Sequence, residues 1–309
     1  MKYLLLLLLI NTHAFGQQHI DTTEIIHIGG IKQYVRIKGK DQSKPLLLLL
    51  HGGPGASLMA KTDAMTGKLQ QHFLVVQWDQ RETGETRRLN KTSQPLTLQL
   101  FYDDTHDLVD SLLRQFQRTK LFLIGYSWGT VLGFYMADQY PELLYAYIAV
   151  SPVIDQRRSD SISLAMLKQT IPEARNELSK VKIPIESAEQ LYYHRKWLFK
   201  HDGQKFVSIT LRKSVVEAWG DTWFDVWSRA CTNNRFESLP AIKCPVYFFA
   251  GERDYNTNHS ITREYFNKVS APKKDFFLFH NAGHGLPETD AESFQDVVIN
   301  LILPKTFNP

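Results

Sequence analysis

Cysteine is scarce in this chain, which contains only Cys231 and Cys244 among its 309 residues. Neither lies in a Cys/His spacing typical of a metal site, so we expect no bound metal. Two cysteines allow at most one disulfide. One disulfide, which an exported protein could form, and two free thiols are the open alternatives.

Long runs of one charge are missing as well. The net charge is +4, and the basic residues Arg87-Arg88 and Arg157-Arg158 form isolated pairs instead of a continuous arm. This distribution is typical of a solvated surface, so we expect no nucleic-acid partner. Hydrophobic residues make up 43% and charged residues 22% of the chain. Such a composition and length fit one large globular domain, with or without an insertion.

The unbroken apolar run Leu4–Ile10 is far too short to cross a bilayer, which takes about 20 residues. The small residues Ala14 and Gly16 then stand two apart, which suits signal peptidase cleavage after Gly16. We predict that residues 1–16 are a signal peptide and that the protein is exported, periplasmic or secreted, without stable membrane insertion. The alternative is a buried first strand.

Apolar runs alternate with helix-like segments along most of the chain. A pair of short strands around Gly29-Gly30 predicts a β-hairpin, and continuous apolar runs predict strands buried on both faces. Strands alternating with helices indicate an α/β fold, with a mostly parallel sheet covered by helices on both faces. The predicted hairpin strands are Glu24–Ile28 and Tyr34–Ile37, the other strands Leu46–Leu50, Phe73–Trp78, Leu121–Gly125, Tyr147–Val150, Val246–Ala250 and Lys274–Phe279, and the long helices Thr97–Gln117, Ser260–Val269 and Ala291–Leu303.

The pattern changes in the middle of the chain. Residues 155–243 are polar, helix-like and rich in Trp and Tyr, with no strand of the earlier kind. We predict a helical cap here, inserted between two parts of the core, residues 17–154 and 244–309. Open α/β sheets bind ligands beyond the carboxyl ends of their strands, so this cap would cover the site.

Gly125-Tyr126-Ser127-Trp128-Gly129 matches the G-x-S-x-G pattern of a nucleophile elbow. It follows a buried strand and opens a helix, as such an elbow requires. The nucleophile sits on a strained strand-to-helix turn, where side chains two residues to either side would collide. The alternative is a surface serine in an ordinary turn.

His51-Gly52-Gly53-Pro54-Gly55 also follows a buried strand. Its glycines let backbone N–H groups approach a ligand closely, as an oxyanion hole needs, where each donor is worth about 2.7–4 kcal/mol of transition-state stabilisation. We expect the donors to be the N–H groups of Gly53 and Trp128, with His51 bracing the loop. The alternative is a plain Gly-Pro turn.

A serine hydroxyl needs a base to become a nucleophile. His284 lies in a loop after the last predicted strand, whereas His280 at the end of that strand is expected to interact locally. Asp254 follows a buried strand and would orient the imidazole, with Glu252 as the rival carboxylate. The order Ser127, Asp254, His284 along the chain is that of α/β hydrolases.

These segments together resemble the prolyl iminopeptidase family, a branch of the α/β hydrolases. The resemblance rests on H-G-G-P-G at 51–55, W-D-Q-R at 78–81, S-W-G at 127–129, and the segments around Asp254 and His284. It implies release of an N-terminal residue, often proline, from short peptides, without metal or cofactor. Two residues depart from the family pattern, since Glu82 and Tyr126 stand where the family has glycine, and these departures point to a looser relative.

In this family, acidic residues of the cap bind the protonated amine of the substrate. We select Glu217, beside Trp219, as the candidate for amine and side-chain binding. The alternative for each cap acid is a solvated position on the outer face of a helix. The alternative for the tryptophans is packing in the core of the helix instead of contact with substrate. Further acidic residues that the cap offers for this role are Glu173, Glu177, Glu186, Glu189, Asp221, Asp225 and Glu237.

The sequence thus favours an exported serine aminopeptidase that acts on small peptides. Its Ser127 would form the acyl-enzyme with the N-terminal residue of the substrate. A carboxylesterase or lactonase on the same scaffold is the alternative, because fold and triad do not fix the acyl substrate. The third hypothesis is a non-catalytic protein that keeps the hydrolase fold for binding. Dehalogenase and epoxide hydrolase chemistry are disfavoured because both use a carboxylate at the elbow. The oligomeric state is left open.

Native protein is expected to begin near Gln17, because signal peptidase removes the residues before it. N-terminal sequencing or intact-mass measurement of the protein purified from its own source tests this. A native chain that begins at Met1 would contradict the prediction.

Overall fold

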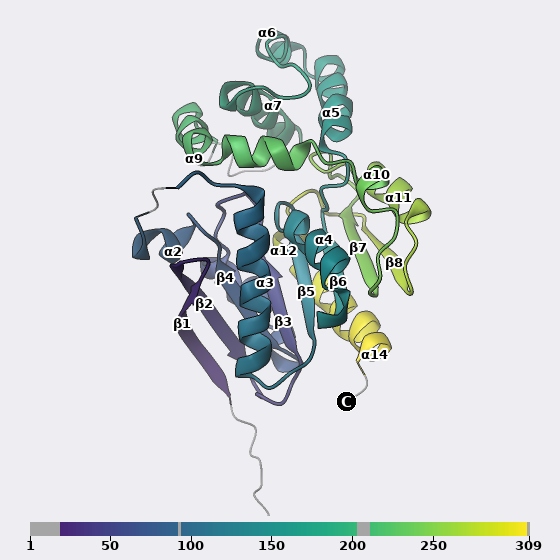
Figure 1. Cartoon of the computed structure of the whole chain (residues 1–309). Helices are drawn as coiled ribbons and strands as arrows, with labels where there is room; N and C mark the ends of the chain where they lie inside the picture. The colour runs from purple at the N-terminus through teal and green to yellow at the C-terminus, as the bar shows by residue number, and fades with distance from the viewer. Residues whose placement is uncertain (1–18, 92–93, 203–210, 308–309) are drawn as a thin grey trace, which may run out of the picture.

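The computed structural model describes residues 19–91, 94–202 and 211–307 (Figure 1). The predicted signal peptide, residues 1–16, lies outside the described residues. Among the helices that are described, none is both long and apolar enough to span a membrane. Both cysteines are free thiols, Cys231 partly buried and Cys244 buried, which decides the open alternative against a disulfide.

The centre of the fold is an eight-stranded sheet with the order β1-β2-β4-β3-β5-β6-β7-β8. β1 and β2 form the predicted hairpin, β2 pairs antiparallel with β4, and every other pairing is parallel. This confirms the predicted fold class. The strands are β1 (Ile20–Ile28), β2 (Ile31–Gly39), β3 (Leu46–Leu50), β4 (Leu74–Asp79), β5 (Leu121–Tyr126), β6 (Leu144–Val150), β7 (Val246–Gly251) and β8 (Lys274–Phe279).

Helices cover both faces of this sheet, which explains why its strands β3, β4 and β5 are buried at every position. Alternate residues of β3 enter two separate clusters: Leu48 packs with α3 and α4, and Leu49 packs with α1 and α13. Thr97 caps α3 as predicted, since its hydroxyl accepts a hydrogen bond from Leu100 N–H at 3.3 Å. The helices of the core are α1 (Thr62–Thr66), α2 (Gly84–Leu89), α3 (Leu98–Gln115), α4 (Gly129–Gln139), α11 (His259–Lys268), α12 (Leu286–Thr289), α13 (Ala291–Val297) and α14 (Leu303–Thr306).

The predicted final helix differs in form from the expectation. Instead of one α-helix over 291–303, α13 continues through a π-helical turn, Val298–Ile302, into α14. Val298 and Ile302 are both buried, so the wider turn keeps the apolar side of this segment against the sheet.

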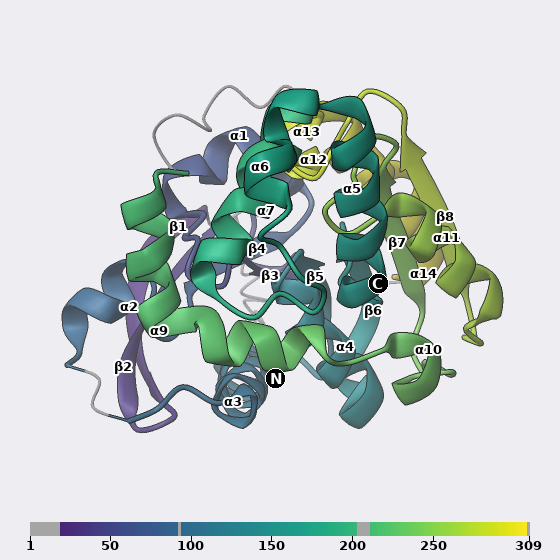
Figure 2. The same cartoon turned by 90° about the horizontal axis from the view of Figure 1, so that it is seen from above.

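The segment between β6 and β7 is helical and lies above the carboxyl ends of the strands, as Figures 1 and 2 show for α5, α6, α7 and α9. It has its own apolar cluster, which includes Leu167, Leu178 and Leu198. α9 also packs downward, because Trp223 and Val226 join the core cluster on the α3 side of the sheet. The helices are α5 (Gln156–Thr170), α6 (Arg175–Leu178), α7 (Ala188–His201), α9 (Lys213–Cys231) and α10 (Arg235–Ser238).

A fully buried ion pair ties the antiparallel edge to the rest of the molecule. Arg81 donates to both carboxylate oxygens of Asp104 at 3.0 and 2.9 Å, and to the carbonyl of Gly29 at 2.8 Å. Neither side chain of the pair has any exposed surface. Burial raises the pKa of Asp104 despite the adjacent guanidinium, which shows how strongly the site disfavours an isolated charge.

Replacing Asp104 by Ala is expected to lower the free energy of unfolding by about 3–5 kcal/mol, because it leaves the Arg81 charge buried and unpaired. Urea denaturation measures this. The matched control removes Asp21, whose pair with Arg36 is partly exposed, and should lose about 1 kcal/mol or less. Equal losses in the two variants would contradict the prediction.

Candidate functional site

Ser127 lies at the sharp turn between β5 and α4, and its φ of +52° is in the left-handed region. A Cβ on Gly125 would lie 2.7 Å from the carbonyl oxygen of Gly129, and a Cβ on Gly129 would lie 2.2 Å from the carbonyl oxygen of Leu50. Both contacts are too short for any larger residue. The two glycines are therefore required sterically, as the elbow pattern predicts.

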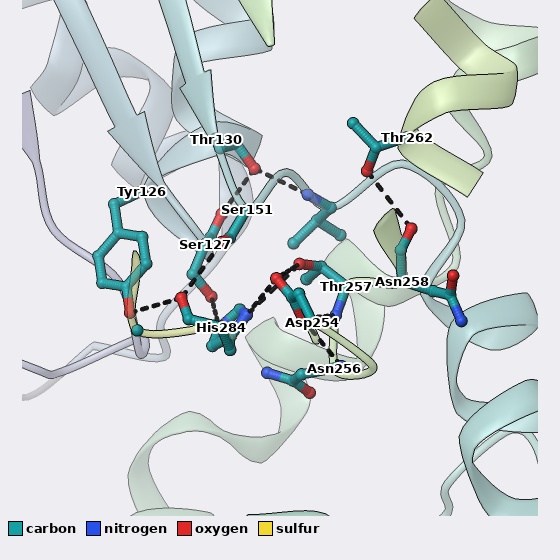
Figure 3. A network of polar contacts seen from close by, with 12 residues as sticks. Tyr126, Ser127, Thr130, Ser151, Asp254, Asn256, Thr257, Asn258, Thr262 and His284 are labelled. Atoms are coloured by element: carbon teal, nitrogen blue, oxygen red, sulfur yellow. Dashed lines mark hydrogen bonds and ion pairs between the residues drawn. The ribbon is translucent and has the colours of Figure 1, made fainter. Parts of the chain in front are cut away.

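Ser127, His284 and Asp254 come together from three different loops, as Figure 3 shows. His284 Nε2 lies 3.0 Å from Ser127 Oγ, and His284 Nδ1 lies 3.0 Å from Asp254 Oδ2. Asp254 is completely buried and His284 is nearly so, while Ser127 is partly open. This hydroxyl–imidazole–carboxylate chain has the geometry needed to move a proton from serine to histidine.

The charge on Asp254 is held in place by its own loop. Burial favours the neutral acid, but the nearby His284 charge and hydrogen bonds lower the pKa of Asp254 to about 2. The donors are Asn256 N–H at 2.9 Å, Thr257 N–H at 3.0 Å and the Thr257 hydroxyl at 2.9 Å. Asp254 therefore stays ionised near neutral pH and can stabilise an imidazolium.

The loop of His284 is fixed from the sheet. The hydroxyls of Tyr126 and Ser151 donate to the His284 carbonyl at 3.1 and 3.2 Å. Tyr126 is one of the two departures from the family pattern, and the structure gives it this positioning contact. Sequence reasoning missed that contact because it joins positions 158 residues apart.

The rival carboxylate Glu252 is placed elsewhere. It pairs with His280 at 3.2 Å, and both side chains are largely exposed. This is the local interaction expected for His280, and it leaves Asp254 as the carboxylate that contacts His284.

The loop from His51 to Gly55 runs beside the elbow. A Cβ on Gly52 would lie 3.2 Å from Ser127 Cβ, so the loop approaches the hydroxyl as closely as its glycines permit. Within the described residues, neither the Gly53 N–H nor the Trp128 N–H donates a hydrogen bond. Both donors are therefore free for an oxyanion.

The two cap residues selected from the sequence have different positions. Glu217 is half exposed and its carboxylate lies 3.8 Å from Lys213 Nζ, and no recorded contact of the described residues joins it to Ser127. Trp219, by contrast, donates its indole N–H to the Pro54 carbonyl at 2.9 Å and so contacts the glycine-rich loop.

A cap acid that the sequence did not single out lies near the site. Asp202 is the C-cap residue directly after α7, its side chain is only 2% exposed, and it interacts electrostatically with Asp254 and His284. Neither carboxylate oxygen accepts a hydrogen bond from any described residue. No sequence signal marks this acid, because its position depends on how the cap helices fold back over the sheet.

The second departure, Glu82, stands at a position whose backbone suits glycine. Its φ is +58°, in the region that favours glycine. This fits a position where the family has glycine, and the Glu82 carboxylate lies 3.9 Å from Arg87 Nε.

Comparison with known proteins agrees with this geometry. The family model described as serine aminopeptidase, S33, matches residues 41–290. The probable aminopeptidase YbaC of Bacillus subtilis is 27% identical over 283 residues, covering 84% of this chain and 89% of that protein. A proline iminopeptidase of Lactobacillus helveticus is 30% identical over 269 residues, covering 82% and 88%.

Solved structures share the fold. The proline iminopeptidase of Mycobacterium smegmatis superposes with a TM-score of 0.64 at 18% identity, covering 90% of this chain and 96% of that one. Fold, sequence match and the resemblance derived from the motifs agree, and the chain belongs to the serine aminopeptidase S33 family of α/β hydrolases.

Proposed function

We propose that this protein is an exported serine aminopeptidase that releases the N-terminal residue of short peptides, proline included, through an acyl-enzyme on Ser127. The observation that carries the proposal is the buried carboxylate of Asp202 near the Ser127–His284–Asp254 chain, because neither of its oxygens accepts a hydrogen bond from the described residues. The family match and the aminopeptidase relatives support it. Export rests on the sequence features of residues 1–16.

Among the described residues, the recorded ion-pair partner of Asp202 is the neighbouring His201, which carries a charge only when it is protonated. Burial, followed by the negative charge of Asp254, raises the pKa of Asp202 to about 6. His201 Nδ1 lies 3.5 Å away, too far for a good hydrogen bond. A buried carboxylate without donors is unfavourable, so the site is suited to a ligand that brings positive charge and N–H groups.

The N-terminal ammonium of a peptide meets this requirement, because it carries one positive charge and three N–H donors, or two where the first residue is proline. In an aminopeptidase substrate the ammonium is separated from the scissile carbonyl by a single α-carbon. Asp202 is near enough to interact with Asp254 and His284, which fits this short spacing. An ester without an amine would gain nothing from Asp202.

The proposed reaction has two stages. His284 Nε2 takes the proton of Ser127 Oγ, which attacks the carbonyl while the N–H groups of Gly53 and Trp128 bind the oxyanion. His284 then gives the proton to the leaving amine. In the second stage water, deprotonated by His284, releases the N-terminal amino acid. Asp254 holds the imidazole in one tautomer throughout.

Assaying aminoacyl arylamides, their N-acetylated forms and simple aryl esters on the mature protein tests the proposal. We expect turnover of the free-amine arylamides, loss of activity on N-acetylation, and loss of both turnover and fluorophosphonate labelling in Ser127→Ala. Good turnover of esters or lactones without hydrolysis of any free-amine arylamide would assign the protein to the esterase alternative.

Replacing Asp202 by Asn separates amine recognition from stability. KM for free-amine arylamides should rise at least about tenfold, the value of one lost charged contact of about 1.4 kcal/mol, while turnover of an amine-free aryl ester stays unchanged. In the wild type, the same contact should weaken below about pH 6, as Asp202 takes up its proton. The matched control is Glu217→Gln, which removes an exposed cap acid.

The wild type and Asp202→Asn should also differ in how their free energy of unfolding depends on pH. Because folding raises the pKa of Asp202 to about 6, the folded state binds more protons than the unfolded state between about pH 4 and 6. Stability therefore falls as the pH rises through this window, by about 3 kcal/mol relative to Asp202→Asn. Urea denaturation at pH 4 and pH 7 measures it. Parallel pH dependence in both proteins would refute the placement of Asp202.

A further inference from the structure

Gln80 connects the glycine-rich loop after β3 with the nucleophile elbow after β5. Its side chain is completely buried at the end of β4. The amide Nε2 donates to the carbonyl of His51 at 3.1 Å, and the amide Oε1 accepts from the indole Nε1 of Trp128 at 3.0 Å. One planar group therefore joins the residue that precedes the glycine-rich loop to the residue that follows Ser127.

The backbone of Gln80 strengthens the first of these connections. Its N–H donates to His51 Nε2 at 3.2 Å, and His51 Nδ1 lies 2.8 Å from the carbonyl oxygen of Gly52. Burial lowers the pKa of His51, so the ring is neutral with its proton on Nδ1. His51 is thus held by Gln80 on one side and holds Gly52 on the other.

The second connection is equally constrained. Trp128 is 2% exposed, and the ring of Phe101 packs edge-on against its indole at 5.6 Å. With the ring held by packing and its N–H by Gln80, the indole has one orientation. The backbone N–H of the same residue is the proposed oxyanion donor next to the nucleophile.

The sheet order explains why such a connection is needed. The two donor loops follow β3 and β5, which are neighbours, and Gln80 arrives from β4 on the far side of β3. A developing oxyanion requires both donors within about 2.7–3.1 Å of one point. A side chain bonded to both loops fixes their separation.

We propose that Gln80 is a positioning residue that sets the distance between the oxyanion donors Gly53 and Trp128. The proposal rests on the proposed function only in that Ser127 is the nucleophile. Because the oxyanion forms only during attack, loss of this positioning lowers kcat and leaves substrate binding unchanged.

The chain contains a matched control of the same chemistry. Gln33 Oε1 accepts from the indole Nε1 of Trp78 at 2.7 Å, and both of these side chains are buried as deeply as Gln80 and Trp128. This pair lies on β2 and β4 and contacts neither donor loop in any recorded hydrogen bond of the described residues. Gln33 also hydrogen-bonds Asp104 of the buried ion pair, so replacing Gln33 lowers stability without the loss of positioning.

The experiment compares Gln80→Met with Gln33→Met in the full mature protein. Both variants should melt at similarly reduced temperatures. Only Gln80→Met should lower kcat, by about 10- to 100-fold, with KM within about twofold of wild type, for an aminoacyl arylamide and an aryl ester alike. Affinity for a trifluoromethyl ketone, which forms a tetrahedral adduct, should fall in proportion, while affinity for the product amino acid stays constant.

A second variant covers the case in which Gln80→Met does not fold. Trp128→Phe keeps a ring in place but removes the N–H that Gln80 accepts, and should lower kcat in the same way. Where both fold, their effects should not add in the double variant, because they break one connection. Unchanged kcat in Gln80→Met or in Trp128→Phe, or an equal loss in Gln33→Met, would overturn the proposal.

The readouts separate this proposal from the proposed function. A wild type that hydrolyses esters but no arylamide refutes the aminopeptidase assignment and still reports on Gln80 through the ester. A wild type whose Ser127 does not react with a fluorophosphonate refutes both.

Discussion

The whole site depends on the left-handed backbone of Ser127. That conformation is accessible only because Gly125 and Gly129 carry no side chain, and Gly129 packs directly against the carbonyl of Leu50 at the end of β3. The elbow and the glycine-rich loop are thereby brought into contact by the same constraint that exposes the hydroxyl. The parallel sheet then delivers Asp254 and His284 to the same edge, from the ends of β7 and β8.

Two aspartates in this site are in opposite electrostatic conditions. Asp254 is fully buried but receives hydrogen bonds from its own loop and from His284, so its charge is stable. Asp202 is nearly as buried and receives none from the described residues. The hydrogen bonds of the first are complete in the free protein, whereas in the proposed function a ligand supplies those of the second. In the proposed function this difference separates the residue that supports chemistry from the one that selects the substrate.

The sequence was sufficient for the parts of the site that are local. Ser127, Asp254 and His284 could be placed because each follows a predicted strand, and the carboxyl ends of parallel strands meet at one edge. Asp202 and Gln80 could not, because their roles come from contacts with distant segments: one depends on how the cap folds back, the other on three strands lying side by side. Glu217 was selected for its tryptophan neighbours, yet the helix turns it toward solvent and Lys213.

The hydrogen bond from Trp219 to Pro54 couples the cap to the glycine-rich loop. Because this indole N–H of α9 is bonded to the backbone next to Gly53, a displacement of α9 would be transmitted to that loop. Within the proposed function, the helix that covers the substrate and the loop that binds the oxyanion therefore form one mechanical unit.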